Sequence, residues 1–464
     1  MSAPAFVADD TVTQEVARFI ASVGSEDVPD DVRAHARRSL LDTVGCGLYG
    51  STLRWSRILR STLGEIDGGD ACGVWGTGTR LSGPHAALAN GAAVHAFELD
   101  DLHKESILHA GSAATPAALA AAEMCGGVAG DRFLTGVIVG YEVGARVGMT
   151  MGTAHLLQGW HPTGTHGALA AAAAAASVFG LTHEQAQHAL GIAGSQASGL
   201  MAAQYFSMVK RFHAGRAAQS GLYAALLARA GYTGIANLFE SEYGGYCSTF
   251  SPTYDLASLT DGLGSRWEAG RVGYKPYSAN GSCHPAIEIV QEIRKRNGIT
   301  ADMVDKVRVF ASSATVAHVG WLYEPKSATT AQMNLSYIVA VTLVDGEAFV
   351  DQFSESRISD PTLIELAGRV TVSADPDIDR GGNAHRHSTR ISIHLKDGRV
   401  FGGAKQFARG SAAAPLADEE VRAKYRRLAG SVLTATRVAD LEVTIDRIDQ
   451  LQSAALASAL AVSS

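Results

Sequence analysis

Residues 90–123 read NGAAVHAFELDDLHKESILHAGSAATPAALAAAE, in which a charged centre separates two Ala-rich, helix-forming flanks. The titratable side chains of this centre are Glu98, Asp100, Asp101, His103, Lys104, Glu105 and His109. Burying charged groups between two apolar helices costs free energy unless the charges are paired or used. A titratable cluster in such a setting is a functional-site candidate. The stretch therefore predicts two helices joined by a loop that carries chemistry.

His109 opens the small-residue run HAGSAATP and faces the start of the second flanking helix. The free N–H groups of a helix N-terminus, here near Gly111 and Ser112, form a ready site for an anion. Lys104 and Glu105 alone are equally consistent with a solvated loop, since charged side chains prefer the surface. We interpret the whole stretch as an anion-binding acid/base loop.

The composition is typical of a compact protein. Hydrophobic residues make up 46% of the 464 residues and charged residues only 18%, which argues against disorder. The net charge of −7 argues against a nucleic-acid partner, because neutralising phosphates needs a basic surface.

Neither a disulfide framework nor a metal centre is indicated by the cysteines. All five are scattered, with no CxxC pair and no histidine at zinc-ligand spacing. The N-terminus is acidic and lacks the basic and apolar segments of a signal peptide. The longest apolar run, residues 168–179, is too short to span a bilayer. We expect a soluble, cytoplasmic protein with no membrane partner.

From residue 11 to about 264 the pattern predicts helices punctuated by Gly or Pro. Pro29 suits the first turn of one helix, and Thr182 with Gln185 forms a capping box at the start of another. Further helices are expected over residues 114–125, 133–147, 167–179, 182–192 and 214–230. Their interiors are rich in Ala and Gly, which let helix axes approach closely, so we expect a tightly packed bundle.

Beyond residue 264 the pattern changes. Residues 306–312, 369–375 and 390–403 alternate in the manner of strands, and Asp397-Gly398 is a hairpin signal. Two apolar segments between these strands are helical in pattern, and the chain returns to helix near its end.

These patterns predict a mainly α protein with an α+β second domain. The helical domain takes residues 1–265 and 408–464, and the α+β lid domain takes residues 266–407. A helical body interrupted by a smaller lobe implies a cleft between them, where small-molecule sites tend to lie.

Four more stretches combine glycines with reactive side chains. They are GWHPTGTHGA with His161 and His166, MVKRFHAGRAAQSG with Lys210, Arg211, His213 and Arg216, GYKPYSANGSCHPA with Lys275, Tyr277, Asn280, Ser282 and His284, and AHVGWLYEP with His318 and Tyr323. His166 is equally explained as a helix N-terminal histidine bonded to backbone. His161 stands in a Gly/Pro-framed turn of the kind that carries function. A basic cluster in an acidic chain suggests attraction for an anionic ligand.

The chain contains no GxGxxG after a strand, no P-loop and no GxSxG elbow, so we expect no cofactor. Imidazoles titrating near neutrality can move protons at a carbon next to a carboxylate, while Lys and Arg hold the carboxylates. The residues therefore predict a proton-transfer lyase or isomerase that acts on a small polycarboxylate.

The chain resembles the MmgE/PrpD superfamily in the strings NGAAVHAFELDDLHKESILHAGS, GWHPTGTHGALAA, ALGIAGSQASGL, KRFHAGRAAQSGLYAALLARAGYTG and AQMNLSYIVAVTLVDG. This superfamily includes 2-methylcitrate dehydratases, cis-aconitate decarboxylases and iminodisuccinate epimerase, and the resemblance runs from end to end. The strings ELDDLHKESILHAGS, GLMAAQYFSMVKR and KYRRLAGSV are most similar to fungal-type cis-aconitate decarboxylases. The resemblance implies a helical domain with a lid, a homodimer, and neither a metal nor an organic cofactor.

The resemblance also implies roles for single residues. His109 matches a histidine that donates or accepts a proton, His161 matches a second active-site histidine, and Lys210 and Lys275 match carboxylate-binding lysines. With the residue analysis, the catalytic candidates are His109, His161 and Glu98. The substrate-binding candidates are Lys210, Lys275, His103, Asp101, Asn280 and Tyr323.

Three positions depart from the family pattern. Glu98 stands where many members have Asp, Leu102 where Thr is common, and Asn280 where animal cis-aconitate decarboxylases have His. A hydroxyl lost at Leu102 changes which acid the site accepts if the substrate needs that hydrogen bond.

We expect a di- or tricarboxylate held by Lys210, Lys275 and the backbone of Gly111 and Ser112. In the decarboxylase reaction, His109 protonates an alkene carbon of cis-aconitate while a carboxylate leaves as CO2. A 2-methylcitrate dehydratase and an epimerase of an imino- or hydroxy-dicarboxylate would use the same acid/base site. A non-catalytic carboxylate-binding homologue is the alternative outside enzymes.

Overall fold

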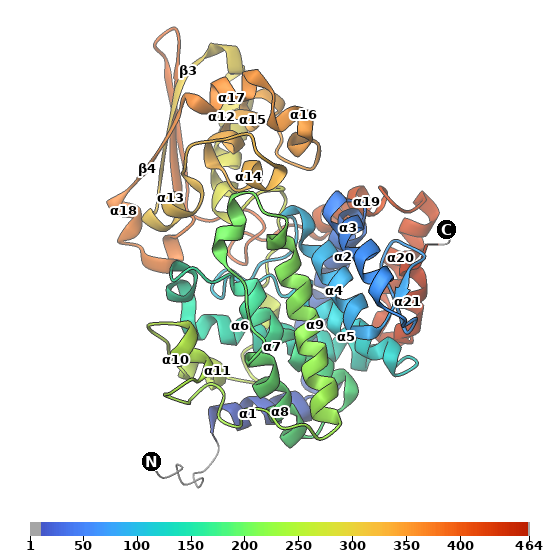
Figure 1. Ribbon diagram of the computed structural model, residues 1–464. Coiled ribbons are helices and arrows are strands. Elements are labelled where there is room, and N and C mark those ends of the chain that lie inside the picture. Colours follow the sequence, from blue (N-terminus) through green and yellow to red (C-terminus); the bar gives the residue numbers. More distant parts are fainter. Residues whose placement is uncertain (1–10, 463–464) are drawn as a thin grey trace.

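The computed structural model describes residues 11–462, and Figure 1 shows a helical body and a smaller part of mixed helices and strands. The helices that lead up to this smaller part are α1 Val12–Ser22, α2 Asp30–Ser51, α3 Arg54–Ile66, α4 Gly83–Val94, α5 Gly111–Met124, α6 Gly130–Leu157, α7 Pro162–Phe179, α8 His183–Gly194, α9 Val209–Arg229, α10 Tyr246–Phe250 and α11 Ala257–Thr260. A short hairpin, β1 Cys72–Gly73 and β2 Arg80–Leu81, lies between α3 and α4.

Helix α7 packs against α5, α6 and α9 (Figure 1). Every residue from 168 to 176 is buried, because side chains this small let the neighbouring helices approach the α7 backbone. A Cβ added at Gly140 of α6 would lie 2.8 Å from the carbonyl oxygen of Ala170, so a larger residue has no room there. The expected bundle of closely packed, small-residue helices is confirmed.

The last three helices return to the body beside the first ones (Figure 1). They are α19 Asp418–Ala429, α20 Ala435–Asp446 and α21 Ser453–Leu460. Helix α19 packs along α2, and Lys424 Nζ donates to Asp42 Oδ1 at 2.6 Å between two buried side chains. The chain between α11 and α19 therefore leaves the helical body and comes back to it.

The smaller part holds the remaining elements: α12 His284–Asn297, β3 Val304–Ala311, α13 Ser313–Val319, α14 Ala328–Gln332, α15 Leu335–Asp345, α16 Glu355–Ile358, α17 Pro361–Gly368, β4 Val370–Ala374, α18 Pro376–Asp379, β5 Thr389–Leu395 and β6 Val400–Lys405. The strand order is β4-β3-β5-β6. Strands β3 and β4 are parallel, whereas β5 pairs antiparallel with both β3 and β6. Helices α12 and α15 pack on this sheet.

The fold class expected from the sequence, mainly α with an α+β second part, is therefore confirmed. The division into residues 1–265 with 408–464 and residues 266–407 stays a proposal, and the name lid is kept for residues 266–407. The Thr182 capping box is present, with Gln185 as its partner. None of the helices within residues 11–462 is long and apolar enough to cross a membrane.

Some predicted helix limits were wrong. Pro29 is the N-cap of α2 rather than part of its first turn. Helix α6 runs from Gly130 to Leu157, well past the predicted residue 147, and contains a kink at Gly152, where φ is 52°. Residues 230–264 are mostly irregular, with only the short helices α10 and α11, because isolated apolar residues there pack on the body without a helical repeat.

Candidate active site

The charged centre of residues 98–109 forms a buried, irregular loop between α4 and α5. Within the described chain it contains both non-glycine residues with positive φ, Glu98 at 56° and Ile107 at 57°. Such conformations cost of order 1–3 kcal/mol each and persist only when the surroundings determine them. The loop is therefore held in shape by its contacts.

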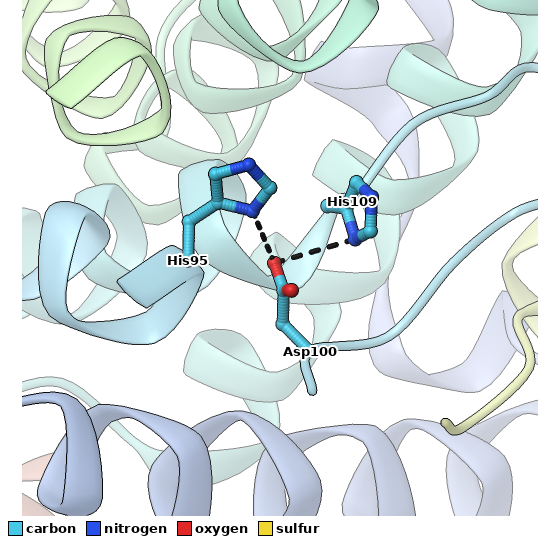
Figure 2. A group of neighbouring side chains, drawn as sticks. All are labelled: His95, Asp100 and His109. Atoms are coloured by element: carbon cyan, nitrogen blue, oxygen red, sulfur yellow. Dashed lines mark hydrogen bonds and ion pairs between the residues drawn. The ribbon is translucent and has the colours of Figure 1, made fainter. Parts of the chain in front are cut away.

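Asp100 is the centre of the first group of contacts (Figure 2). Its Oδ2 accepts a hydrogen bond from His95 Nδ1 at 2.7 Å, and His109 Nδ1 lies 3.3 Å from the same oxygen. Burial alone would raise the pKa of Asp100, but the two imidazoles outweigh burial and hold this pKa well below its usual value. Asp100 is thus held as an anion that favours a proton on His95 Nδ1 and lies at ion-pair distance from His109 Nδ1.

His95 lies directly before the loop and is neutral at physiological pH. Burial lowers its pKa to about 3, against the opposing charge of Asp100. The rings of His95 and His109 meet edge to face with centroids 4.8 Å apart. His95 was not among the residues selected from the sequence, although its place in the same stretch as His109 was a usable signal.

His161 is the N-cap residue of α7, and its ring centroid lies 5.4 Å from that of His95. His161 Nδ1 is 3.1 Å from Nδ1 of His213, which comes from α9. Burial, with the charge of Lys210 as a further cause, holds the pKa of His161 well below its usual value. His109, His95, His161 and His213 therefore form a row of imidazoles that joins three separate segments.

Glu98 is the centre of the second group. Its side chain accepts hydrogen bonds from Lys210 and from Arg211 Nη1, the latter at 2.6 Å, both at the start of α9. Lys275 Nζ donates to its second oxygen at 3.2 Å. All four side chains are buried. Three cations therefore share one carboxylate, which leaves an excess of positive charge beside the imidazoles.

This excess shifts the pKa values of the group. Burial would raise the pKa of Glu98, yet Lys210, Lys275 and Arg211 hold it well below its usual value. Burial lowers the pKa of Lys210 to about 8, and Arg211 and Lys275 add to that effect against the attraction of Glu98. Lys210 therefore loses its proton more easily than a lysine in water.

A cavity of about 240 Å³ lies between the body and the lid. This is smaller than the roughly 300 Å³ at which drug-sized ligand pockets begin, so its size suits a small acid. His109, Leu102 and Ile107 line it from the loop, and Lys275, Asn280 and His318 line it from the lid. Of the nine candidates from the sequence, His109, Lys275 and Asn280 line this cavity.

Asp101 and His103 are not among the residues that line the cavity. Asp101 accepts hydrogen bonds from the Tyr141 hydroxyl at 2.6 Å and from the Gly111 N–H at 3.1 Å. Burial raises the pKa of Asp101 to about 8, and these two donors oppose the rise. His103 contacts Ser106 Oγ at 2.9 Å and Glu268 at 3.3 Å. In these positions both side chains hold the loop rather than reach the cavity.

The predicted anion site at the start of α5 was wrong. The Gly111 N–H is bonded to the carboxylate of Asp101, and the Ser112 N–H to the carbonyl oxygen of His109 at 3.3 Å. The start of α5 does bind an acidic side chain. That side chain is Asp101 of the protein itself, so these N–H groups are not available for a substrate.

Asn280 and Tyr323 occupy different surroundings. Asn280 lines the cavity, and its Oδ1 caps the turn at Ser282 with a bond of 3.0 Å. The Tyr323 hydroxyl donates to the carbonyl oxygen of Ile358 at 2.7 Å, and its ring packs on Tyr337 inside the lid. Tyr323 is not among the residues that line the cavity.

Arg386 and His387 also line the cavity, and neither was selected from the sequence. They belong to the segment RGGNAHRHS, residues 380–388, before β5. Its concentration of basic and imidazole groups between two strands was the signal that could have found them.

His95, Asp100 and His109 also have the donor types of a metal site, with ligand atoms within 4.8 Å of one another (Figure 2). Their surroundings do not suit a cation, however. Lys210 and His109 both act against charge on His95, and His95 Nε2 lacks the acceptor that normally orients a metal-bound imidazole. The contacts fit a proton better than a metal ion, and the expected lack of a metal stays a prediction.

Comparison with known proteins supports the resemblance over the whole chain. The MmgE/PrpD N-terminal domain matches residues 14–257, and the MmgE/PrpD C-terminal domain matches residues 277–450. A cis-aconitate decarboxylase-like protein of Aspergillus oryzae is 35% identical, with 94% of each chain covered. The cis-aconitate decarboxylase of Aspergillus terreus is 34% identical, covering 95% of this chain and 94% of its own. The mouse cis-aconitate decarboxylase is 27% identical, covering 97% and 93%. The chain belongs to the MmgE/PrpD family.

Proposed function

We propose that this protein is a lyase that decarboxylates cis-aconitate to itaconate by histidine acid/base chemistry, without a metal or organic cofactor. The observation that carries the proposal is the contact of His109 with Asp100 at the wall of the cavity. Because Asp100 contacts Nδ1 of His109, Nε2 of the same ring is left to exchange a proton with a bound molecule. The relatives named cis-aconitate decarboxylase support the choice of substrate.

The reaction needs one proton and one leaving group. Cis-aconitate has a carboxylate on a CH2 carbon next to its double bond. When that carboxylate leaves as CO2, the electrons of the broken C–C bond form a new terminal double bond. The electrons of the old double bond take a proton from His109 at the CH carbon. The trianion and one proton thus become the itaconate dianion and CO2, and His109 regains its proton from solvent.

The surrounding charges suit this change. Lys275 at the cavity wall and Lys210, which does not line the cavity but pairs with the same Glu98, would together attract two carboxylates of the substrate. Glu98 keeps the two ammonium groups in place. The nearby rings of His95 and His161 are neutral because burial lowers the pKa of each. They add no positive charge that would hold the departing carboxylate in its ionised form.

Proton NMR of the purified protein with cis-aconitate in deuterated buffer tests the proposal. We expect itaconate with one deuterium on its saturated CH2 carbon. His109→Ala should abolish this product and leave the melting curve nearly unchanged. His85→Ala is the matched control, because His85 also pairs with a carboxylate, Asp67 at 2.9 Å, but does not line the cavity.

Two other outcomes would assign the protein a different reaction of the same family. Loss of water from 2-methylcitrate would make it a hydro-lyase, and deuterium exchange into iminodisuccinate without other change would make it an epimerase. Both reactions use the same histidine. Calorimetric binding of polycarboxylates with no turnover of any of the three acids would identify a binding protein instead.

We also propose a homodimer, on the strength of the family resemblance alone, and a cytoplasmic location. Light scattering of the purified protein at micromolar concentration would show twice the chain mass of 48.4 kDa. The chain mass itself would refute the dimer.

A further inference from the structure

Arg386 is a buried cation of the lid that lines the same cavity. It lies between the 3-10 turn Gly382–His385 and β5, and only 7% of its surface is exposed. Burial lowers the pKa of its guanidinium to about 10. The side chain therefore keeps its positive charge at neutral pH.

Within residues 11–462 no carboxylate lies at ion-pair distance from this guanidinium, and Glu105 of the loop acts on it only from farther away. The guanidinium donates to three neutral acceptors, the Lys104 carbonyl oxygen at 3.0 Å, Asn383 Oδ1 at 3.3 Å and His387 Nε2 at 3.3 Å. The other buried cations at the site differ, since Lys210, Arg211 and Lys275 all pair with Glu98. A buried charge without a partner is costly to the fold, unless a bound anion completes it.

The position of Arg386 is well defined by its neighbours. Its carbonyl oxygen accepts hydrogen bonds from Ser312 Oγ at 2.7 Å and Thr315 Oγ1 at 2.8 Å, both at the start of α13. Burial, followed by the charge of Arg386, keeps the pKa of His387 well below its usual value. His387 is therefore neutral and can accept the bond from Arg386 Nε, which fixes the plane of the guanidinium.

Arg386 also connects the lid to the buried loop of residues 98–109. Its Nη2 donates to the carbonyl oxygen of Lys104, and Lys104 Nζ donates back to the carbonyl oxygen of Ala384 at 2.8 Å. Lys104 belongs to the same loop as Asp100 and His109. A ligand bound by Arg386 would thus contact the lid at the place where the lid contacts that loop.

We propose that Arg386 binds one carboxylate of the substrate and thereby determines that the site takes an acid with one more carboxylate than Lys210 and Lys275 can hold. The flat guanidinium can bind a carboxylate through two parallel hydrogen bonds. The proposal rests on the proposed function for the substrate class. It assigns Arg386 a part in specificity that the catalytic residues do not have.

The test compares the wild type with Arg386→Gln and Arg386→Lys. We expect Arg386→Gln to raise KM for cis-aconitate about 10- to 100-fold, the effect of losing hydrogen bonds to a charged group, with a smaller change in kcat. Arg386→Lys keeps the positive charge but lacks the planar guanidinium, so its KM should lie between the values of the wild type and Arg386→Gln. Arg380→Gln is the matched control, because Arg380 is an exposed arginine of the same segment that pairs with Asp377.

Calorimetry with unreactive acids separates this proposal from the proposed function. Tricarballylate and glutarate differ by one carboxylate, so the wild type should bind tricarballylate more tightly and Arg386→Gln should lose most of that preference. If the wild type binds both acids with this difference but does not turn over cis-aconitate, the role of Arg386 stands and the proposed reaction is wrong. If Arg386→Gln keeps the wild-type KM and the wild-type preference, Arg386 does not bind the substrate. If the wild type binds neither acid, both proposals are wrong.

Discussion

Nδ1 of His109 lies 3.3 Å from Oδ2 of Asp100, and that same oxygen also accepts a hydrogen bond from His95 (Figure 2). Asp100 does not line the cavity. We therefore propose that it acts through His109, as a positioning residue that sets the tautomer and the direction of the imidazole.

Asp100→Asn should therefore lower kcat about 10²- to 10⁴-fold, the usual contribution of general acid–base catalysis. An amide can donate as well as accept, so it no longer requires a proton on His109 Nδ1. The affinity for tricarballylate, measured by calorimetry, should stay near the wild-type value. Asp67→Asn, which alters the separate pair with His85, is the control. An equal loss of affinity and kcat in Asp100→Asn would show a general disturbance of the site instead.

The rate should depend on pH through Lys210. Because burial lowers the pKa of Lys210 to about 8, this side chain loses its proton as the pH rises through that value. The attraction for substrate carboxylates weakens with it, so kcat/KM should fall above about pH 8. The decline of kcat should begin at higher pH, since a bound carboxylate stabilises the ammonium form. Lys210→Met should have a lower kcat/KM at neutral pH with no decline near pH 8. A decline that persists in Lys210→Met would belong to another group.

Glu98→Gln should destabilise the protein by about 3–5 kcal/mol, the usual effect of removing one partner from a buried ion pair. Lys210, Arg211 and Lys275 would be left without a counter-ion. Citrate should then raise the melting temperature of the variant more than that of the wild type. Glu365→Gln, at the exposed pair with Arg369, should cost less than about 1 kcal/mol.

The pH dependence of stability gives a second measure of Glu98. Its pKa in the folded protein lies well below the usual value, so its contribution is present above the unfolded pKa of about 4.3. That contribution is lost as the pH falls further. Urea unfolding between pH 3 and pH 7 should therefore show that the free energy of unfolding falls more steeply with decreasing pH in the wild type than in Glu98→Gln. Equal slopes would mean that Glu98 is not an ion in the folded protein.

Gly215→Ala should destabilise the body by about 1–3 kcal/mol, the typical cost of overpacking. A Cβ at Gly215 of α9 would lie 2.1 Å from the Leu88 carbonyl oxygen of α4. Moving α9 away would also displace Lys210 and Arg211, so KM should rise. Gly64→Ala is the control, because Gly64 lies in α3 with nothing within 4 Å of the added Cβ. It should be neutral or stabilising by up to about 1 kcal/mol. A Gly215→Ala variant as stable as wild type would show that α4 and α9 can separate.

Much of the fold could be predicted because its signals are local. The Ala- and Gly-rich runs of α5, α7 and α9 are long, periodic and compatible only with close helix packing. The alternation in β3 and β5 is equally clear. Residues 230–264 could not be predicted in the same way, because their structure depends on contacts with the body rather than on a repeat.

The site was predictable in part for the same reason. His109 and Glu98 lie in a single stretch between two apolar helices. Buried charges there need counter-ions or hydrogen-bond partners, and the sequence alone shows that need. Which partners they find was not evident, because Lys210, Lys275 and Arg386 lie more than a hundred residues away in the chain. Asp101 was taken for a substrate contact, whereas the structure shows that Tyr141 and the start of α5 already use its carboxylate.

The amino-acid sequence by itself determined the helical body, the mixed lid and the stretch where acid/base groups gather. Local periodicity and the cost of buried charge depend on residues that are close together in the sequence. Only the tertiary structure decided which charges meet. It placed Glu98 among three cations, set His109 against Asp100 and left the guanidinium of Arg386 at the cavity with no carboxylate of residues 11–462 at ion-pair distance. These relationships depend on distances between segments far apart in the chain, which only the packing of the helices and the lid can set.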